Sequence, residues 1–139
     1  MADKKQTPHK QVEEIMHYGV ITCRLDTLLK EVVRIIADTD VHALIVVDDN
    51  GCVVGVVSHV DLLSLYGQNL LTHTAKDVMR AEVITISPQA AVKDAVALML
   101  EHQIRRLVVT EKTPVGERPL GVISTTDVIR DMRGQPWFW

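Results

Sequence analysis

The chain has 139 residues, of which 47% are hydrophobic, 24% are charged and only 4% are aromatic, and its formal net charge is -3. This length fits one compact domain or two small units that share an aliphatic core. A slightly acidic chain argues against a nucleic-acid-binding protein, because such proteins gain most of their affinity by neutralising phosphates.

The cysteines and the apolar runs indicate the compartment. Cys23 and Cys52 form no C-x-x-C pair and are too few for a disulfide framework. No apolar run reaches the ~18 residues of a membrane span. The beginning of the chain, MADKKQTPHK, lacks the apolar middle of a signal peptide. We therefore expect a cytoplasmic protein that works in a reducing compartment, away from membranes.

The first half of the chain predicts a β-α-β-β-α unit after a flexible tail at 1–10. Asp26 is a candidate cap for a helix whose apolar residues are spaced by three and four. Asp49-Asn50-Gly51 predicts a hairpin turn between two strands, and a short helix follows Ser58. The strands are predicted at 19–23, 43–48 and 52–58, and the first helix at 28–38.

The second half predicts the same elements. Ser87-Pro88 reads as a cap followed by proline at the first helical position. A longer loop separates the last two strands, and a short helix follows Ser124. The strands are predicted at 82–86, 106–110 and 119–124, and the helix at 90–102. The near-continuous Val/Ile runs indicate strands that are covered on both faces.

The two halves form an internal repeat. Met16 matches Met79 at an offset of 63 residues, and Gly55 matches Gly121 at 66, after one insertion in a turn. We expect an α/β fold of two β-α-β-β-α repeats, packed as a pseudo-twofold pair with small sheets flanked by helices. The predicted parts are a tail at 1–10, repeats at 11–67 and 74–133, a linker at 68–73 and an aromatic tail at 134–139.

The repeat resembles the CBS domain, and the two copies together resemble a CBS pair, or Bateman module. The resemblance is carried by the two methionines, by Val-Ile-Thr at 20–22 and 83–85, by basic residues before the second long strand, and by the Gly-x-x-Ser-x-x-Asp endings. It implies two clefts between the repeats for adenosine-containing ligands such as AMP, ADP, ATP, S-adenosylmethionine or NAD. It also implies a homodimer and regulation of a partner protein, with no obligatory cofactor.

The resemblance assigns each cleft its residues from both repeats. An aspartate accepts hydrogen bonds from ribose hydroxyls, a serine donates to phosphate, and apolar residues line the adenine. One cleft would combine Ser58, Val60 and Asp61 with Val83, Ile84, Arg105 and Arg106. The other would combine Ser124, Thr126 and Asp127 with Val20, Ile21, His42 and Ala43. Because it has two guanidiniums, we expect the first cleft to bind polyphosphate better, and Arg106→Ala to weaken ATP binding.

Each of these assignments has a plainer alternative. Ser-x-x-Asp before a helix is also an ordinary capping arrangement. The two arginines are also explained as an exposed pair near a helix end, and His42 as a histidine that is merely hydrogen-bonded.

The leading hypothesis is a stand-alone regulatory module that binds an adenine nucleotide and acts on a partner in trans. The competing hypothesis is a ligand-independent homodimeric scaffold. An enzyme is a distant third, because the sequence has no P-loop, no G-x-S-x-G motif and no pattern of metal ligands. Trp137-Phe138-Trp139 predicts an aromatic tail that docks on a protein surface.

Overall fold

The computed structural model describes residues 10–39, 41 and 43–134, so His42 and the Trp137-Phe138-Trp139 tail lie outside the described residues. The described chain divides into two compact units, neither of which is continuous in sequence. Unit 1 holds residues 10–19, 84–111 and 120–134. Unit 2 holds the remaining described residues, 20–83 without 40 and 42, together with 112–119.

Unit 2 is built on a three-stranded sheet with the order β2-β3-β4. Strand β2 runs parallel to β3, and β3 pairs with β4 in antiparallel register. The predicted turn joins β3 to β4, where Asp48 Oδ1 accepts the backbone N–H of Asn50 at 2.8 Å and Gly51 has φ +78°. The elements are β2 (Thr22–Arg24), α1 (Leu29–Asp38), β3 (Ala43–Val47), β4 (Val53–Ser58), α2 (His59–Leu63) and α3 (Ala75–Val78).

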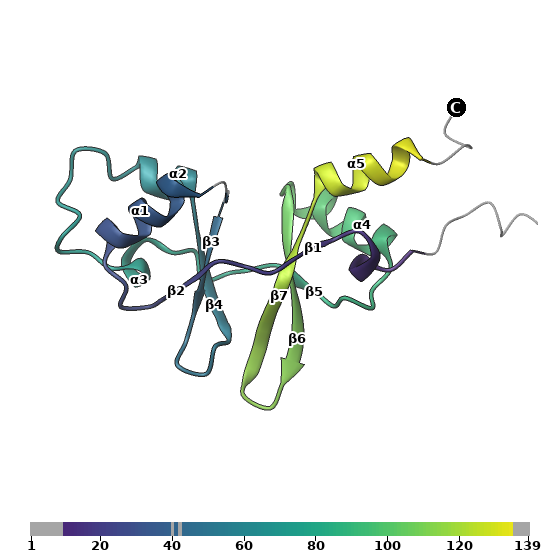
Figure 1. Cartoon of the computed structure of the whole chain (residues 1–139), viewed down its shortest axis with the longest axis horizontal. Helices are drawn as coiled ribbons and strands as arrows, with labels where there is room; N and C mark the ends of the chain where they lie inside the picture. Colours follow the sequence, from purple (N-terminus) through teal and green to yellow (C-terminus); the bar gives the residue numbers. More distant parts are fainter. Residues whose placement is uncertain (1–9, 40, 42, 135–139) are drawn as a thin grey trace, which may run out of the picture. The chain divides into compact units, whose positions relative to one another are not determined.

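Unit 1 is built on a four-stranded sheet with the order β1-β7-β6-β5. The edge strand β1 comes from the beginning of the chain and pairs antiparallel with β7 (Figure 1). The elements are the 3-10 helix η2 (Val12–Glu14), β1 (His17–Tyr18), β5 (Thr85–Ile86), α4 (Val92–His102), β6 (Arg106–Thr113), β7 (Gly116–Ser124) and α5 (Thr125–Arg133).

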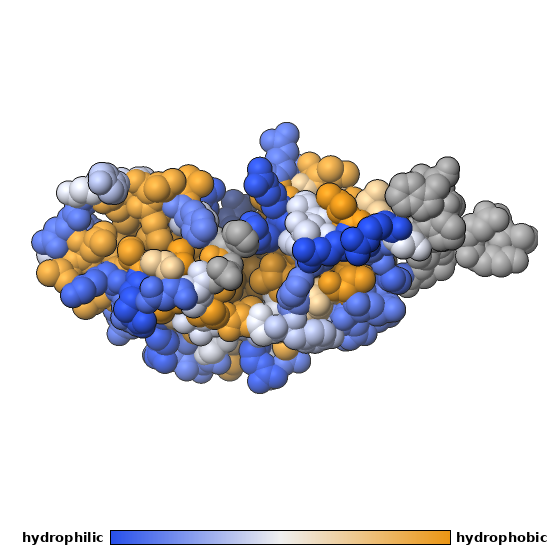
Figure 2. Space-filling view, turned by 45° about the horizontal axis from the view of Figure 1, so that its top comes forward, coloured by the Kyte–Doolittle hydropathy of each residue, from blue (hydrophilic) through white to orange (hydrophobic). Residues whose placement is uncertain are grey.

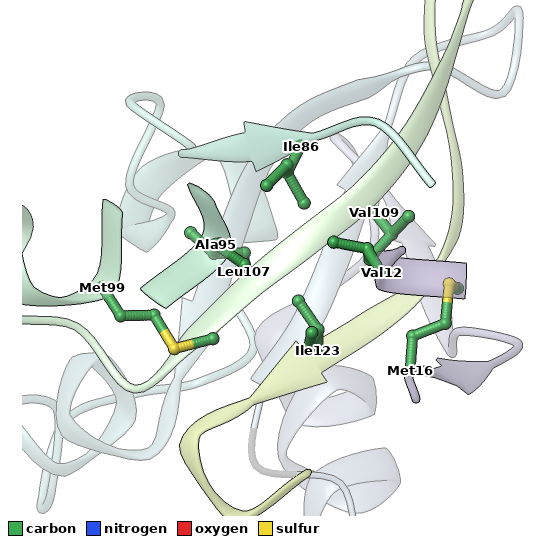
Figure 3. Close-up of a cluster of buried hydrophobic side chains, with 8 residues drawn as sticks. All are labelled: Val12, Met16, Ile86, Ala95, Met99, Leu107, Val109 and Ile123. Carbon is green, nitrogen blue, oxygen red and sulfur yellow. The ribbon is translucent and has the colours of Figure 1, made fainter. Parts of the chain in front are cut away.

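The predicted α/β class, with small sheets and flanking helices, is confirmed. Each unit has an aliphatic core. In unit 1 the N-terminal segment supplies Val12 and Met16, which lie against Val109 and Ile123 from the central strands (Figure 3). In unit 2 the core includes Leu29, Val32, Leu44, Val46 and Val57. Residues 44–47 and 107–110 are buried throughout, as the Val/Ile runs predicted.

The helices begin within two residues of their predicted starts, but the predicted caps are wrong in both repeats. Helix α1 begins after Leu28 and α4 after Ala91, and neither of these residues has a side chain that caps the helix. Asp26 therefore does not cap α1. The Ser87 hydroxyl caps a turn upstream of α4 instead, accepting the Gln89 N–H at 3.1 Å. Backbone pairing replaces the expected caps: the Leu29 N–H donates to His73, and the Val92 N–H to Lys10.

The described residues contain no helix that is long and apolar enough to cross a membrane.

Candidate nucleotide-binding turns

The first Ser-x-x-Asp turn joins β4 to α2 and forms a reciprocal capping box. Asp61 Oδ2 accepts the backbone N–H and the hydroxyl of Ser58, both at 2.9 Å. The Asp61 N–H donates back to Ser58 Oγ at 3.4 Å. The Asp61 carboxylate is fixed by the turn and is 10% exposed.

The second turn, between β7 and α5, repeats this geometry. Asp127 Oδ2 accepts the backbone N–H of Ser124 at 2.8 Å and its hydroxyl at 3.0 Å. The Asp127 side chain is only 4% exposed. Capping is therefore part of the role of both aspartates, and it uses one oxygen of each carboxylate. The other oxygen faces a different partner.

A basic side chain from the beginning of the other repeat contacts that second oxygen. His17 Nδ1 lies 2.9 Å from Asp127 Oδ1, and Arg80 Nε lies 3.0 Å from Asp61 Oδ1. Burial raises the pKa of the Asp61 carboxyl, but the hydrogen bonds from Ser58 and the Arg80 guanidinium outweigh it and lower that pKa below its usual value. Asp61 is therefore ionised at neutral pH and accepts hydrogen bonds only.

The glycine at the start of each motif makes room for these cations. A Cβ on Gly121 would collide with the backbone carbonyl of His17, and one on Gly55 would collide with the side chain of Met79. Gly55 also lies beside the Arg80 backbone, whose N–H and C=O pair with Val56 at 2.9 and 3.0 Å. Glycine at these positions lets the neighbouring backbone approach closely.

The two arginines lie beside the second turn. The Thr125 N–H donates to the carbonyl of Arg105 at 2.9 Å, which places Arg105 at the start of α5. Burial and the neighbouring Arg105 charge lower the pKa of Arg106 from its usual value, although a guanidinium stays charged at neutral pH. In unit 2, Ala43 occupies the position that corresponds to Arg106 at the offset of 63 residues, and it pairs with Ser58. The turn at Ser124 therefore has arginines beside it, whereas the described residue at the matching place in unit 2 is alanine.

The predicted adenine-wall residues occupy matching places in the two units. Ile84 accepts the Val108 N–H at 3.3 Å in unit 1, and Ile21 accepts the Ile45 N–H at 3.2 Å in unit 2. Val20, Val83 and Ile84 are half-buried, and Ile21 is 37% exposed. The sheets therefore engage the carbonyls of Ile21 and Ile84.

The described residues contain no group of three or more His, Cys, Asp or Glu side chains that could hold a metal ion.

The CBS domain model matches residues 12–67 and 75–134. The chain belongs to the CBS domain family. A CBS domain pair, the protein MJ0100 in complex with 5-methylthioadenosine and S-adenosyl-L-methionine, superposes with a TM-score of 0.79 at 24% identity, over 91% of this chain and 98% of that one. The AMP complex of CBSX2 superposes with a TM-score of 0.76 at 24% identity, over 88% of this chain and 96% of that one.

Curated relatives are longer than this chain. An uncharacterized 33.4 kDa protein of Thermofilum pendens is 34% identical over 102 residues, which are 73% of this chain and 32% of that protein. The inosine-5'-monophosphate dehydrogenase of Methanocaldococcus jannaschii is 25% identical over 87% of this chain and 23% of its own length. The CBS pair thus matches less than a third of each of these two relatives.

Sequence reasoning missed His17 and Arg80 as partners of the two aspartates in this CBS pair. The signal was available, because the residue after each repeated methionine is basic in both copies. Its meaning depends on pairing between distant segments, which one sequence does not reveal.

Proposed function

We propose that this CBS pair is a regulatory module that binds AMP, ADP or ATP and modulates a partner protein. One observation carries the proposal: both units present an aspartate that is held by its turn, with one oxygen outside the capping box. A carboxylate in this setting is a strong acceptor for ribose hydroxyls. Solved CBS pairs of the same fold hold AMP in one case and adenosyl ligands in another, so S-adenosylmethionine and NAD are further candidates.

The proposed roles follow the chemistry of each group. Asp61 and Asp127 accept from ribose, while Ser58, Ser124 and Thr126 offer hydroxyls to phosphate. The apolar wall for adenine is Val20, Ile21, Val83 and Ile84.

We assign Arg105 and Arg106 to the turn at Ser124. The sequence prediction paired them with Ser58 and Asp61, but the hydrogen bond between Thr125 and Arg105 supports the turn of their own repeat. Two guanidiniums beside a hydroxyl-rich helix start suit a phosphate chain. The predicted preference for polyphosphate then moves to the turn that holds Asp127.

Thermal unfolding with AMP, ADP, ATP, S-adenosylmethionine and NADH tests the function. A ligand that binds only the native protein raises the melting temperature. We expect at least one adenine nucleotide to do so at millimolar concentration. The absence of any shift with the whole panel would overturn the proposal and favour the ligand-independent scaffold.

A second experiment tests the assignment of the arginines. In an Asp61→Asn background, Arg105→Ala should weaken ATP binding and leave adenosine binding unchanged, because only phosphate uses the guanidinium. In an Asp127→Asn background, Arg105→Ala should have no further effect on ATP. Lys112→Ala, which removes an exposed cation from the strand β6 that follows Arg105, is the control. If Arg105→Ala weakened ATP binding only in the Asp127→Asn background, that result would support the original pairing of Arg105 with Asp61.

Exposed apolar side chains favour a dimer as well. Val60 and Leu63 on α2 are 65% and 71% exposed, and Ile129 on α5 is 63% exposed. Figure 2 shows apolar surface over the part of the molecule that carries α1 and α2. We propose that a second copy of the chain covers these helices. Leu63→Glu should shift the mass measured by light scattering from dimer to monomer, while Lys30→Glu on α1 should not.

A further inference from the structure

Each ribose-binding candidate is paired with a basic side chain. His17 and Arg80 occupy matching positions, one residue after Met16 and Met79, and each contacts Oδ1 of one aspartate at 2.9 or 3.0 Å. Each comes from the beginning of one repeat and contacts the aspartate of the other. The same contact between a basic side chain and a turn aspartate therefore occurs once in each unit.

The backbone holds both cations in place. His17 pairs with Val122 in the β1–β7 ladder. Arg80 pairs with Val56 through two hydrogen bonds outside any named strand pair. Val56 and Val122 match at the offset of 66 that relates the two turns. The side chains are exposed, 70% for His17 and 64% for Arg80, so either can swing away from its carboxylate.

The number of acceptor positions on each carboxylate shows how the basic side chain limits hydrogen bonding to a ribose. A carboxylate has about four acceptor positions. At each aspartate the serine takes two of them on Oδ2, and the cation takes one on Oδ1. About one position then remains, while the two hydroxyls of a ribose need two. A ribose can use both hydroxyls only if the cation leaves Oδ1.

Arg80 and His17 differ in how strongly they bind a carboxylate. Arginine is charged at every accessible pH and donates through a fixed fork. The histidine contact uses one ring nitrogen, which is the weaker neutral donor unless the ring is protonated. The Arg80 contact is therefore always charged, whereas the His17 contact is charged only when the ring is protonated.

We propose that His17 and Arg80 are specificity-determining residues that compete with ribose for the aspartates, so that Asp127 binds a nucleotide ribose more tightly than Asp61. This inference rests on the proposed nucleotide-binding function. The residue after each repeated methionine then decides which turn prefers a ribonucleotide.

Exchanging the two cations tests the inference. AMP binding is measured by calorimetry at about pH 8 in two backgrounds, Asp61→Asn and Asp127→Asn, which leave one aspartate each. In the first, His17→Arg should weaken AMP binding about fivefold, the factor for an exposed ion pair worth up to ~1 kcal/mol. In the second, Arg80→His should strengthen it by a similar factor. Circular dichroism and melting temperature show whether each variant is folded.

The matched ligand is 2'-deoxyadenosine 5'-monophosphate, which lacks one of the competing hydroxyls. Its affinity should change less than that of AMP in both exchanges. The sign is also diagnostic, because an added positive charge near a phosphate would strengthen binding. Equal changes for the two ligands, no change, or stronger AMP binding in His17→Arg would overturn the inference while the nucleotide-binding function stands. If the wild-type protein binds no nucleotide, the function and this inference are both wrong.

Discussion

The aspartates of the two turns combine a structural and a chemical role in one side chain. The oxygen that closes the capping box fixes the carboxylate, and the other oxygen meets a cation. The capping alternative and the binding hypothesis are therefore compatible. An Asn substitution separates them, because the amide oxygen of asparagine can still accept the serine N–H but the side chain carries no charge.

The lowered pKa of Asp61 makes a stability prediction with a defined sign. A carboxyl whose pKa falls on folding stabilises the protein above its unfolded pKa, about 3.9, and loses that contribution as the pH falls through the folded value. We expect the free energy of unfolding of the wild type to exceed that of Asp61→Asn at pH 6. Urea unfolding should show this gap shrinking below about pH 4. A gap that stays constant down to pH 2 would contradict it.

Cys23 gives a second prediction at this scale. Burial in the core of unit 2 raises the pKa of its thiol to about 11. Because the thiolate is the reactive form, only about 0.1% of the thiol is ionised at pH 8. In a Cys52→Ser variant, alkylation of Cys23 by iodoacetamide should be far slower in the folded than in the urea-unfolded protein. Equal rates would show that the thiol is accessible.

At the scale of elements, the sequence predicted the two longer strands of each repeat and the hairpin turn well, and the helix caps poorly. The Val/Ile runs and Asp49-Asn50-Gly51 carry local information that sets β3 and β4. The starts of α1 and α4 depend instead on hydrogen bonds to His73 and Lys10, which are far away in sequence. Local capping patterns at Asp26 and Ser87 could not reveal these partners.

The close approach of β1 to β7 predicts the effect of a single methyl group. Gly121→Ala would drive a Cβ into the His17 carbonyl, and the backbone cannot yield without separating the strands. We expect a loss of about 3 kcal/mol in unfolding free energy, at the upper end of overpacking costs. Gly134→Ala is the control, since its Cβ would lie 3.7 Å from the nearest atom. Equal stability of the two variants in urea would contradict the close packing.

At the scale of the whole molecule, the repeats of the sequence and the compact units of the structure do not coincide. Residues 10–19, at the beginning of the first repeat, pack with the second repeat, and residues 74–83, at the beginning of the second repeat, pack with the first. A repeat read along the sequence therefore lacks part of its own sheet and core. No local pattern predicts this exchange, and for this reason the sequence did not predict the contacts of His17 and Arg80 with the aspartates.

This exchange makes Val12 a core residue of a sheet whose strands β5, β6 and β7 lie more than 70 residues later in the sequence. Val12 is fully buried against β6 and β7. Val12→Ala should lower the unfolding free energy by about 2 kcal/mol through lost burial and the cavity left behind. Hydrogen exchange should then rise in β6 and β7 as well as near residue 12. Faster exchange confined to residues 10–19 would show that the segment contributes nothing to unit 1.

The central claim is that the two turn aspartates bind the ribose of an adenine nucleotide. The most direct measurement is calorimetric titration of AMP into the wild type and into the Asp61→Asn, Asp127→Asn double variant, with their melting temperatures compared first. We predict binding to the wild type and at least about tenfold weaker binding to the double variant, the factor for losing hydrogen bonds to a charged group. Equal affinity of AMP for the two folded proteins would contradict the claim.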